Sequence, residues 1–342
     1  MNGINMTYAG GLKEFNYTRI YNNGLYGLYT NYDVTQEFDN IFQNTTLNAS
    51  IVEFNMLGGV HLGSYCNHSN ITINATIFRN NQEDALVIES CASSDGVDWY
   101  TLDELDRPKV DYKRYLNITY RTKYVHLNVS WNLFEANRLH GLKILAVQNM
   151  IGLITNNTFT NHRRGALLIT ANSSSTGDSL IRNVSLQIFY NKFYNNSGRY
   201  ALNVACNDLS NKWAQSINVT FNRFEHNHMF DPYGSQLNPR SSASAVAIVS
   251  SSNVAITQNV FNNPLSRVQI ATQLDNYTSV INATYNWFST LTPVYQLDYY
   301  LSNREKCNIQ WKTVRSHVFD HSNRSNLAQI VYWPYSCNDR LW

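Results

Sequence analysis

The sequence has almost no excess of charge and no long apolar run. Its 342 residues carry 26 basic and 24 acidic side chains, a net charge of +2, with no basic stretch and no acidic tail. This balance gives no electrostatic reason to expect nucleic acid or an anionic membrane surface as a partner. No apolar run approaches the roughly 20 residues that cross a bilayer, so the sequence predicts no membrane span within this chain.

Metal-binding and catalytic motifs are also missing. The five cysteines form no Cys-x-x-Cys or Cys/His spacing of the kind that binds zinc. No Ser/His/Asp arrangement, His-Glu-x-x-His motif or phosphate-binding loop occurs. The sequence therefore predicts no cofactor and no metal site.

One short pattern, by contrast, recurs along the chain. The copy INVTFNRFEHN at Ile217–Asn227 has counterparts at Leu127–Asn137, Leu186–Asn196 and Ile281–Phe288. Each copy has a phenylalanine anchor, an asparagine two residues earlier and an aliphatic residue five residues earlier. The phenylalanines are Phe134, Phe159, Phe193, Phe224, Phe261 and Phe288, and the asparagines are Asn132, Asn157, Asn191, Asn222, Asn259 and Asn286.

This pattern predicts an all-β fold, a right-handed parallel β-helix. Val219 and Phe221 alternate with polar residues as on a strand with one apolar face, and Asn222 breaks the alternation as a residue that tolerates left-handed backbone would. Units of short strands without a helix must stack to bury their apolar faces. The phenylalanines would then form an internal stack and the asparagines an amide ladder. Helical solenoids would need an apolar stripe of period 3.6, whereas period 2 recurs here.

The repeat also predicts how the chain is divided. Residues 1–292 would form about nine coils, with Ile20 and Phe54 as anchors of the early ones. A charged loop insertion is expected near residues 92–114, with one further coil around Tyr115–Tyr120. Residues 293–342 would form a C-terminal cap that closes the open end of the helix, with a helix at Val294–Asn303 and an edge strand at Ile330–Tyr332.

The cysteines predict staples if the compartment is oxidising. Cys307 and Cys337 would close the cap, and Cys66 and Cys91 would join neighbouring coils. Cys206 follows a small apolar strand and is predicted to be a buried free thiol, with a pair outside this chain as the alternative.

Seventeen Asn-x-Ser/Thr sequons are present, about twice the number expected by chance. Four of them share one phase, six residues before an anchor, which should face outward: Asn48, Asn128, Asn218 and Asn282. No two of these would lie on adjacent rungs, and we predict that all four are glycosylated. The N-terminus lacks the features of a signal peptide. We therefore expect a fragment of a longer secreted or membrane-anchored protein.

Acidic residues are scarce where a β-helix enzyme would need them. Inverting glycoside hydrolases need two carboxylates ~6.5–9.5 Å apart, and lyases need an acidic cluster for calcium with a basic residue nearby. Few acids occur between Leu127 and Phe288, and the sequence motifs of polygalacturonases are missing. We predict that the chain is not an enzyme, with a polysaccharide lyase as the alternative.

Basic residues recur at the turn after the anchor. The candidate contact residues for a partner or a glycan are Arg138, His140, His162, Arg163 and Arg164. One interpretation is a solvated turn that tolerates polar residues, and the other is a binding stripe aligned by stacking.

The end of the chain resembles a known family. The coil ending Ala283–Phe288 (ATYNWF) is followed by Val318-Phe319-Asp320 and by Asn326–Tyr335 (NLAQIVYWPY). This is similar to the closing segment of β-helix modules in the bark beetle (Anakonda) family. That family usually has two tryptophans, or Tyr-Trp, and then a glycine where this chain has Trp287-Phe288-Ser289, and Arg-Ile where it has His317-Val318. The match covers one module.

This resemblance implies a function. Members of the family are large animal transmembrane proteins with extracellular β-helix repeats, found where three epithelial cells meet. It implies a non-catalytic, glycosylated, extracellular scaffold for cell adhesion or a cell junction, within a membrane-anchored parent. The implied partners are other cell-surface or junction proteins, and a glycan-binding module is an alternative.

Overall fold

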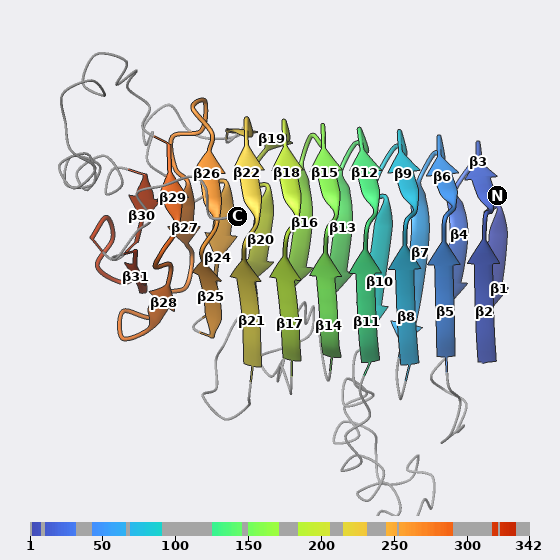
Figure 1. Ribbon diagram of the computed structural model, residues 1–342, viewed down its shortest axis with the longest axis horizontal. Helices are drawn as coiled ribbons and strands as arrows, with labels where there is room; N and C mark the ends of the chain where they lie inside the picture. The colour runs from blue at the N-terminus through green and yellow to red at the C-terminus, as the bar shows by residue number, and fades with distance from the viewer. Residues whose placement is uncertain are drawn as a thin grey trace, which may run out of the picture.

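A computed structural model describes residues 2–7, 11–31, 43–65, 69–90, 125–145, 150–170, 184–205, 215–230, 244–251, 253–289, 317–320 and 322–332. These residues form a column of stacked coils built from short strands, and no helix occurs among them. The coils follow one another from the N-terminal end of the column to β30 and β31 at the other end (Figure 1).

Three parallel sheets make up the walls of the column. Sheet A contains β1 (Ile4–Thr7), β4 (Tyr26–Asn31), β7 (Gly58–Tyr65), β10 (Leu86–Ser90), β13 (His140–Leu145), β16 (Gly165–Thr170), β20 (Leu202–Ala205), β24 (Ala247–Val249), β27 (Ile270–Thr272) and β30 (Val318–Phe319). Sheet B contains β2 (Gly11–Asn16), β5 (Gln43–Asn48), β8 (Ser69–Asn74), β11 (Val125–Ser130), β14 (Met150–Thr155), β17 (Val184–Phe189), β21 (Gln215–Thr220), β25 (Val254–Thr257), β28 (Val280–Asn282) and β31 (Gln329–Val331). Sheet C contains β3 (Arg19–Tyr21), β6 (Ile51–Glu53), β9 (Ile77–Arg79), β12 (Leu133–Glu135), β15 (Thr158–Thr160), β18 (Lys192–Tyr194), β22 (Arg223–Glu225), β26 (Val260–Asn262) and β29 (Trp287–Phe288). A short pair, β19 (Ser197–Gly198) and β23 (His228–Met229), lies between sheets C and A in the chain.

Each coil passes through sheets B, C and A in that order, which gives nine complete coils among the described strands. The pairings between coils among the described strands are parallel; β11, for example, pairs in register with both β8 and β14. Along β11 the residues alternate between buried and exposed, as one apolar face requires. The predicted parallel β-helix is therefore confirmed.

The phenylalanine stack is confirmed as well. All six predicted rings are at most 2% exposed. Their centroids lie 4.6–5.3 Å apart from one coil to the next, with nearly parallel planes. Phe78 of β9 extends the stack by one coil, at 4.9 Å from Phe134. The column interior is thus held at the rung spacing by stacked rings.

The asparagine ladder also forms, at the corner between sheets B and C. Asn132 donates from its backbone N–H and from Nδ2 to Asn157 Oδ1, at 2.9 and 3.0 Å. The same pattern continues through Asn191, Asn222 and Asn259 to the last rung. In the early coils, hydroxyl groups of threonine and serine take the place of the amide, which is why the motif is weaker there in the sequence.

The corner itself differs from the prediction in one residue. The left-handed residue is Phe221, with φ 61°, and not Asn222. Phe221 consequently does not face the core, although the alternation with Val219 predicted that it would. The left-handed turn ends the strand one residue early and directs the next side chain, that of Asn222, inward to the ladder.

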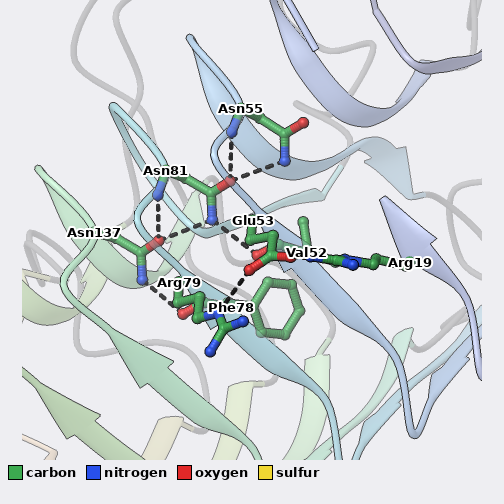
Figure 2. A network of polar contacts seen from close by, with 8 residues as sticks. All are labelled: Arg19, Val52, Glu53, Asn55, Phe78, Arg79, Asn81 and Asn137. Carbon is green, nitrogen blue, oxygen red and sulfur yellow. Dashed lines mark hydrogen bonds and ion pairs between the residues drawn. The ribbon is translucent and has the colours of Figure 1, made fainter. Parts of the chain in front are cut away.

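A second amide ladder runs along the corner between sheets C and A. Asn55 Nδ2 donates to Asn81 Oδ1 at 2.9 Å, and Asn81 Nδ2 donates to Asn137 Oδ1 at 2.8 Å (Figure 2). Beyond Asn137 the ladder resumes with Asn196 and Asn227. The two ladders occupy opposite ends of sheet C and hold its register at both.

The anchor of the second coil was predicted wrongly. Val52, not Phe54, is this anchor, because Val52 pairs with Ile20 and Phe78. Phe54 is 51% exposed and has a left-handed backbone. The further coil expected around Tyr115–Tyr120 lies outside the described residues; the strands on either side pair directly, β8 with β11 and β10 with β13.

Part of the expected cap continues the column. β30 pairs with β27 in sheet A, and β31 pairs with β28 in sheet B. The predicted edge strand at Ile330–Tyr332 therefore exists as β31. The helix predicted at Val294–Asn303 lies outside the described residues.

Candidate functional site

The residues predicted to form a contact stripe fall into two groups. Arg138, Arg163 and Arg164 are exposed at the turn that leads into sheet A. His140 and His162 are only 3% and 0% exposed, so the expectation that they contact a partner is wrong. The turn brings the three arginines to one corner and directs both imidazoles into the protein.

His162 occupies a rung of the second amide ladder. Its backbone N–H donates to Asn196 Oδ1 at 3.1 Å, and its Nδ1 lies 3.3 Å from Asn137 O. The imidazole has no oxygen to accept the amide of Asn137, so the ladder is interrupted here. Nε2 is buried without a hydrogen-bond partner. Burial lowers the pKa of His162 to about 4, because a charged ring would lose its hydration inside the column.

His140 belongs to a buried chain of polar groups that links several coils. Its Nδ1 lies 2.6 Å from Asp84 Oδ1, and its Nε2 lies 2.8 Å from the Tyr200 hydroxyl. Lys143 Nζ lies 3.3 Å from the other oxygen of Asp84. Tyr200 reaches His140 across the coil that contains Gly165, where a Cβ would lie 2.3 Å from the ring. The glycine therefore makes the contact between non-adjacent coils possible.

The protonation states in this chain favour a fixed network. Burial would raise the pKa of Asp84, but the hydrogen bond from His140 and the charges of His140 and Lys143 outweigh it, so the pKa lies below its ordinary value. Burial raises the pKa of Tyr200 to about 12, so the phenol keeps its proton at neutral pH. An ionised Asp84 then accepts a hydrogen bond from His140 Nδ1–H, and Nε2 and the phenol oxygen of Tyr200 share the next hydrogen bond of the chain.

A second buried carboxylate lies on sheet C. Glu53 is fully buried, and arginines from the two neighbouring coils hold it, with Arg79 Nε 2.6 Å from Oε2 and Arg19 Nε 2.7 Å from Oε1 (Figure 2). Burial would raise the pKa of Glu53, but the hydrogen bonds and charges of Arg79 and Arg19 outweigh it and the pKa is lowered. The carboxylate thus stays ionised and joins three coils.

These arrangements are poorly suited to acid–base catalysis at neutral pH. A general acid needs a raised carboxyl pKa, and a nucleophile needs an accessible oxygen. The pKa of Glu53, Asp84 and Glu89 is lowered in each case, and each carboxylate contacts a basic side chain. No group of three or more His, Cys, Asp or Glu side chains that could hold a metal ion occurs in the part of the chain that the structure describes.

Three of the four predicted glycosylation sites share one register. Asn128 and Asn218 lie in the same column of sheet B, three rungs apart, with Leu153 and Gln187 between them. Asn282 follows two rungs later, beyond Ala255.

Asn48 does not belong to this column. It pairs with Asn16 and Asn74, which are themselves sequon asparagines on adjacent rungs. Asn74 Nδ2 donates to Asn48 Oδ1 at 3.0 Å. The error follows from the anchor, because counting from Val52 instead of Phe54 moves Asn48 by two positions.

Sequence reasoning missed a row of aromatic residues, here called the aromatic corner. They occupy the left-handed position between sheets B and C, one residue before the first amide ladder: Tyr17, Trp131, Tyr190, Phe221 and Tyr285. Trp131 is 66% exposed, and the rings of Tyr190 and Phe221 stack at 5.5 Å. The signal was present in the sequence as a large ring directly before the ladder asparagine.

Several predicted features lie outside the described residues. They include all five cysteines, hence both proposed disulfides and the state of Cys206, and the charged loop at residues 92–114. Within the described ranges, no helix has the length and apolarity that crossing a membrane requires.

The chain is similar to one curated protein of the family suggested by its C-terminal motifs. It is 26% identical over 303 residues to the Drosophila melanogaster protein named "Protein bark beetle", a match that covers 84% of this chain and 8% of that protein. No family model matches the chain, and no solved structure matches it. The similarity supports a distant relationship to bark beetle, of which this chain spans a small part.

Proposed function

We propose that this chain is a non-catalytic scaffold within the extracellular, glycosylated part of a cell-surface adhesion or cell-junction protein. The observation that carries the proposal is the continuous parallel pairing of strands through nine coils, with one register shift among the described strands, where β10 pairs with β7. The stacked rings and two amide ladders hold outward side chains at fixed places, one rung of ~4.8 Å apart. A partner protein can bind side chains that are held in such a fixed arrangement.

The relationship to bark beetle supports this proposal. The resemblance at the end of the chain implies extracellular β-helix repeats at epithelial junctions, and the similarity extends over 84% of the chain. Because the chain spans 8% of that protein, the membrane anchor of the parent and its location at the cell surface are part of the proposal. Its partners, other cell-surface or junction proteins, are proposed on the same ground.

The contact surface that we propose is the exposed corner with Arg138, Arg163 and Arg164. Arg138 and Arg163 occupy equivalent positions of neighbouring coils, and Arg164 follows directly. Arginine is favoured in contact surfaces because it pairs with carboxylates through two hydrogen bonds. The loop at residues 92–114 is a second proposed contact.

Binding to cultured epithelial cells tests the scaffold. The tagged chain, produced by secretion, should bind the cell surface saturably, and Arg163→Glu with Arg164→Glu should weaken binding at least about tenfold, the effect of 1.4 kcal/mol. Arg324→Glu, an exposed arginine near the far end of the column, is the matched control and should change nothing. Undiminished binding by the double variant rules out this corner, and absence of saturable binding contradicts the scaffold.

The glycosylation sites that we propose are Asn128, Asn218 and Asn282, whose spacing of two or three rungs leaves room for three glycans. Asn48 also remains a proposed glycosylation site, but a glycan on it would crowd a glycan on a neighbouring sequon. Glycans on Asn48 and Asn74 would be one rung apart, and so we expect them to be mutually exclusive in one molecule. Glycopeptide mass spectrometry on secreted protein measures this, and frequent double occupancy of Asn48 and Asn74 would contradict it.

Disulfides between Cys307 and Cys337 and between Cys66 and Cys91 also remain proposals. An extracellular location would favour them, because thiols oxidise outside the cell. Peptide mapping without reduction tests both pairings and identifies the state of Cys206.

A carbohydrate-active enzyme, most plausibly lyase-like, or a glycan-binding module is the second candidate. The observation behind it is the Asp84, His140, Lys143 and Tyr200 network, in which an imidazole lies between a carboxylate and a phenol as in a proton relay, although these three groups are buried away from a substrate. Incubation with pectins, alginates and glycosaminoglycans should yield no unsaturated products. If unsaturated products are released in quantity, and His140→Ala abolishes their release, the chain is an enzyme and the scaffold proposal is wrong.

A further inference from the structure

Four residues at the left-handed position of the corner between sheets B and C are not aromatic, and one of them is an asparagine: Ala49, Ala75, Asn156 and Gln258. Asn156 occupies the corner position in the coil between Trp131 and Tyr190, because β14 pairs in register with β11 and β17. The backbone N–H of Trp131 donates to Thr155 O at 3.2 Å, and that of Asn156 donates to Phe189 O at 3.3 Å. The three corner side chains therefore project from consecutive rungs, ~4.8 Å apart.

Asn156 is also the first residue of a sequon, Asn156-Asn157-Thr158. Its backbone is left-handed, with φ 55°, like that of the other corner residues, and its side chain is partly exposed. Asn157, by contrast, is buried in the first amide ladder. One N–H of the Asn156 amide donates to Thr155 Oγ1 at 3.1 Å, and an N-linked glycan would replace one N–H and keep the other.

We propose that Asn156 carries an N-linked glycan whose first sugar rests between the indole of Trp131 and the phenol ring of Tyr190. Trp131 is 66% exposed and Tyr190 is 48% exposed, so both present apolar surface beside the attachment atom. The first sugar of such glycans, N-acetylglucosamine, has a face of C–H bonds that packs on aromatic rings. Contact with that face would remove part of the exposed apolar area from water.

The ring of Tyr190 is held in place before the sugar arrives. Tyr190 stacks on Phe221 with an angle of 14° between ring planes and meets Phe189 edge-on at 5.3 Å. Trp131 and Asn156 are fixed at their backbones by the bonds to the next rung. Little conformational freedom remains to be lost when the sugar packs, which favours the contact.

The covalent step is an ordinary glycosyl transfer. An enzyme of the secretory pathway moves an oligosaccharide from a polyprenyl diphosphate donor to the unfolded chain. The Asn156 Nδ2–C1 bond forms, the C1–O bond to the diphosphate breaks, and one amide proton is lost as the diphosphate leaves. The proposal rests on the extracellular location of the proposed function.

Secretion from cultured animal cells, with an added signal peptide, tests the attachment. Glycopeptide mass spectrometry should find Asn156 occupied in wild type and in Thr158→Ser, which keeps the sequon, and empty in Thr158→Val, which removes it. Thr158→Val should then melt about 2–4 °C below Thr158→Ser. An empty Asn156 in folded, secreted wild type overturns the proposal.

The packing of the sugar needs a separate measurement. The difference in melting temperature between Thr158→Val and Thr158→Ser should vanish when Trp131→Ala is also present. The difference should persist in a Tyr285→Ala background, where the lost ring occupies the same corner position four coils from Asn156. Oxidative footprinting needs no change at Trp131: its modification should rise at least twofold in Thr158→Val, and that of Tyr285 should not. If Asn156 is occupied but the melting-temperature difference is the same in the Trp131→Ala and Tyr285→Ala backgrounds, the sugar does not pack on Trp131 and this part of the proposal is wrong.

These outcomes are independent of the scaffold proposal. The added signal peptide supplies entry to the secretory pathway whatever the natural location of the chain. Failure of the glycan appears in mass spectra and melting curves, whereas failure of the scaffold appears as missing cell-surface binding.

Discussion

Single residues at the corner between sheets B and C tolerate a backbone that most side chains avoid. Tyr190 and Phe221 have φ near +60°, a conformation that costs roughly 1–2 kcal/mol for residues other than glycine. The ladder asparagine that follows donates to the rung on each side, as Asn222 does to Asn259 Oδ1 and to Ile188 O. The local cost therefore recurs in each coil and is offset by buried hydrogen bonds next to it.

His162 is the residue whose titration should matter most for stability. Its pKa is about 4 in the folded protein and near 6.5 in the unfolded chain, so between these values the unfolded state binds more protons. The folded state should be fully stabilised above pH 6.5 and lose about 3 kcal/mol as the pH falls to 4.

Replacement of His162 by asparagine should remove this dependence and restore the amide ladder. We expect urea unfolding of His162→Asn to change less between pH 7 and pH 4 than unfolding of wild type, by roughly the same 3 kcal/mol. His226→Asn is the matched control, since that imidazole is exposed at the same corner. Equal acid sensitivity of His162→Asn and wild type would contradict the assignment.

Substitution of Phe193 tests the internal stack of phenylalanines. It lies between Phe159 and Phe224 at 5.0 and 4.6 Å and is fully buried. Phe193→Ala should lower the free energy of unfolding by about 3–5 kcal/mol, because it leaves a cavity and two unstacked neighbours. Phe193→Leu should cost less. Chemical denaturation measures both, and a loss under about 1 kcal/mol in Phe193→Ala would be inconsistent with the stack.

At the scale of elements, sheet A depends on a contact that skips one coil. Tyr200, just before β20, crosses above Gly165 at the start of β16 and reaches His140 at the start of β13. Direct pairing of strands joins only neighbours, so this bond adds a longer link along the sheet.

Gly165→Ala should break that link. The new Cβ would lie 2.3 Å from Tyr200 Cε2, so the ring must move away and the hydroxyl must leave His140. We expect a loss of about 1–3 kcal/mol, as for other overpacked sites. Tyr200→Phe keeps the ring and loses only the hydrogen bond, so it should cost about 1 kcal/mol. If Gly165→Ala costs no more in wild type than in a Tyr200→Ala background, the steric explanation is wrong.

The same elements indicate what sequence could predict. Stacked phenylalanines and ladder asparagines were predictable, because a chain that repeats a residue at each coil must align it. Phe54 was misplaced because Val52 and Phe54 are both apolar. The second ladder distinguishes Val52 from Phe54. Its asparagine follows the anchor by three residues, as Asn137 follows Phe134, and Asn55 stands three residues after Val52.

The candidate site was less predictable, because burial there depends on contacts between distant coils. His140 and His162 were assigned to the surface as polar turn residues. Asp84 lies 56 residues before His140, and Tyr200 lies 60 residues after it. Sequence spacing alone contains no signal for such partners.

For the whole molecule, β10 pairs directly with β13 and β8 with β11, so the strands on either side of residues 91–124 belong to neighbouring coils. Four residues, 146–149, are enough to join β13 to β14 at the equivalent corner. Replacement of residues 91–124 by a four-residue linker should therefore preserve the circular dichroism spectrum and keep the melting temperature within a few degrees. Loss of the β-sheet spectrum would show that the column needs residues 91–124 to fold. Loss of cell binding with an unchanged spectrum would show that residues 91–124 contact the partner.

The hydrogen bonds between coils run along the axis of the column, and this determines how the molecule would respond to being pulled. Tension on the chain ends acts on the outermost coil first and reaches the next only after that one has opened. The coil from Asn132 to Asn157 spans 25 residues, about 80 Å of extended chain against a folded rise of ~4.8 Å. Opening this coil would lengthen the molecule by roughly 75 Å, and longer coils would add more. A column under load would therefore yield in steps and regain its length coil by coil when released.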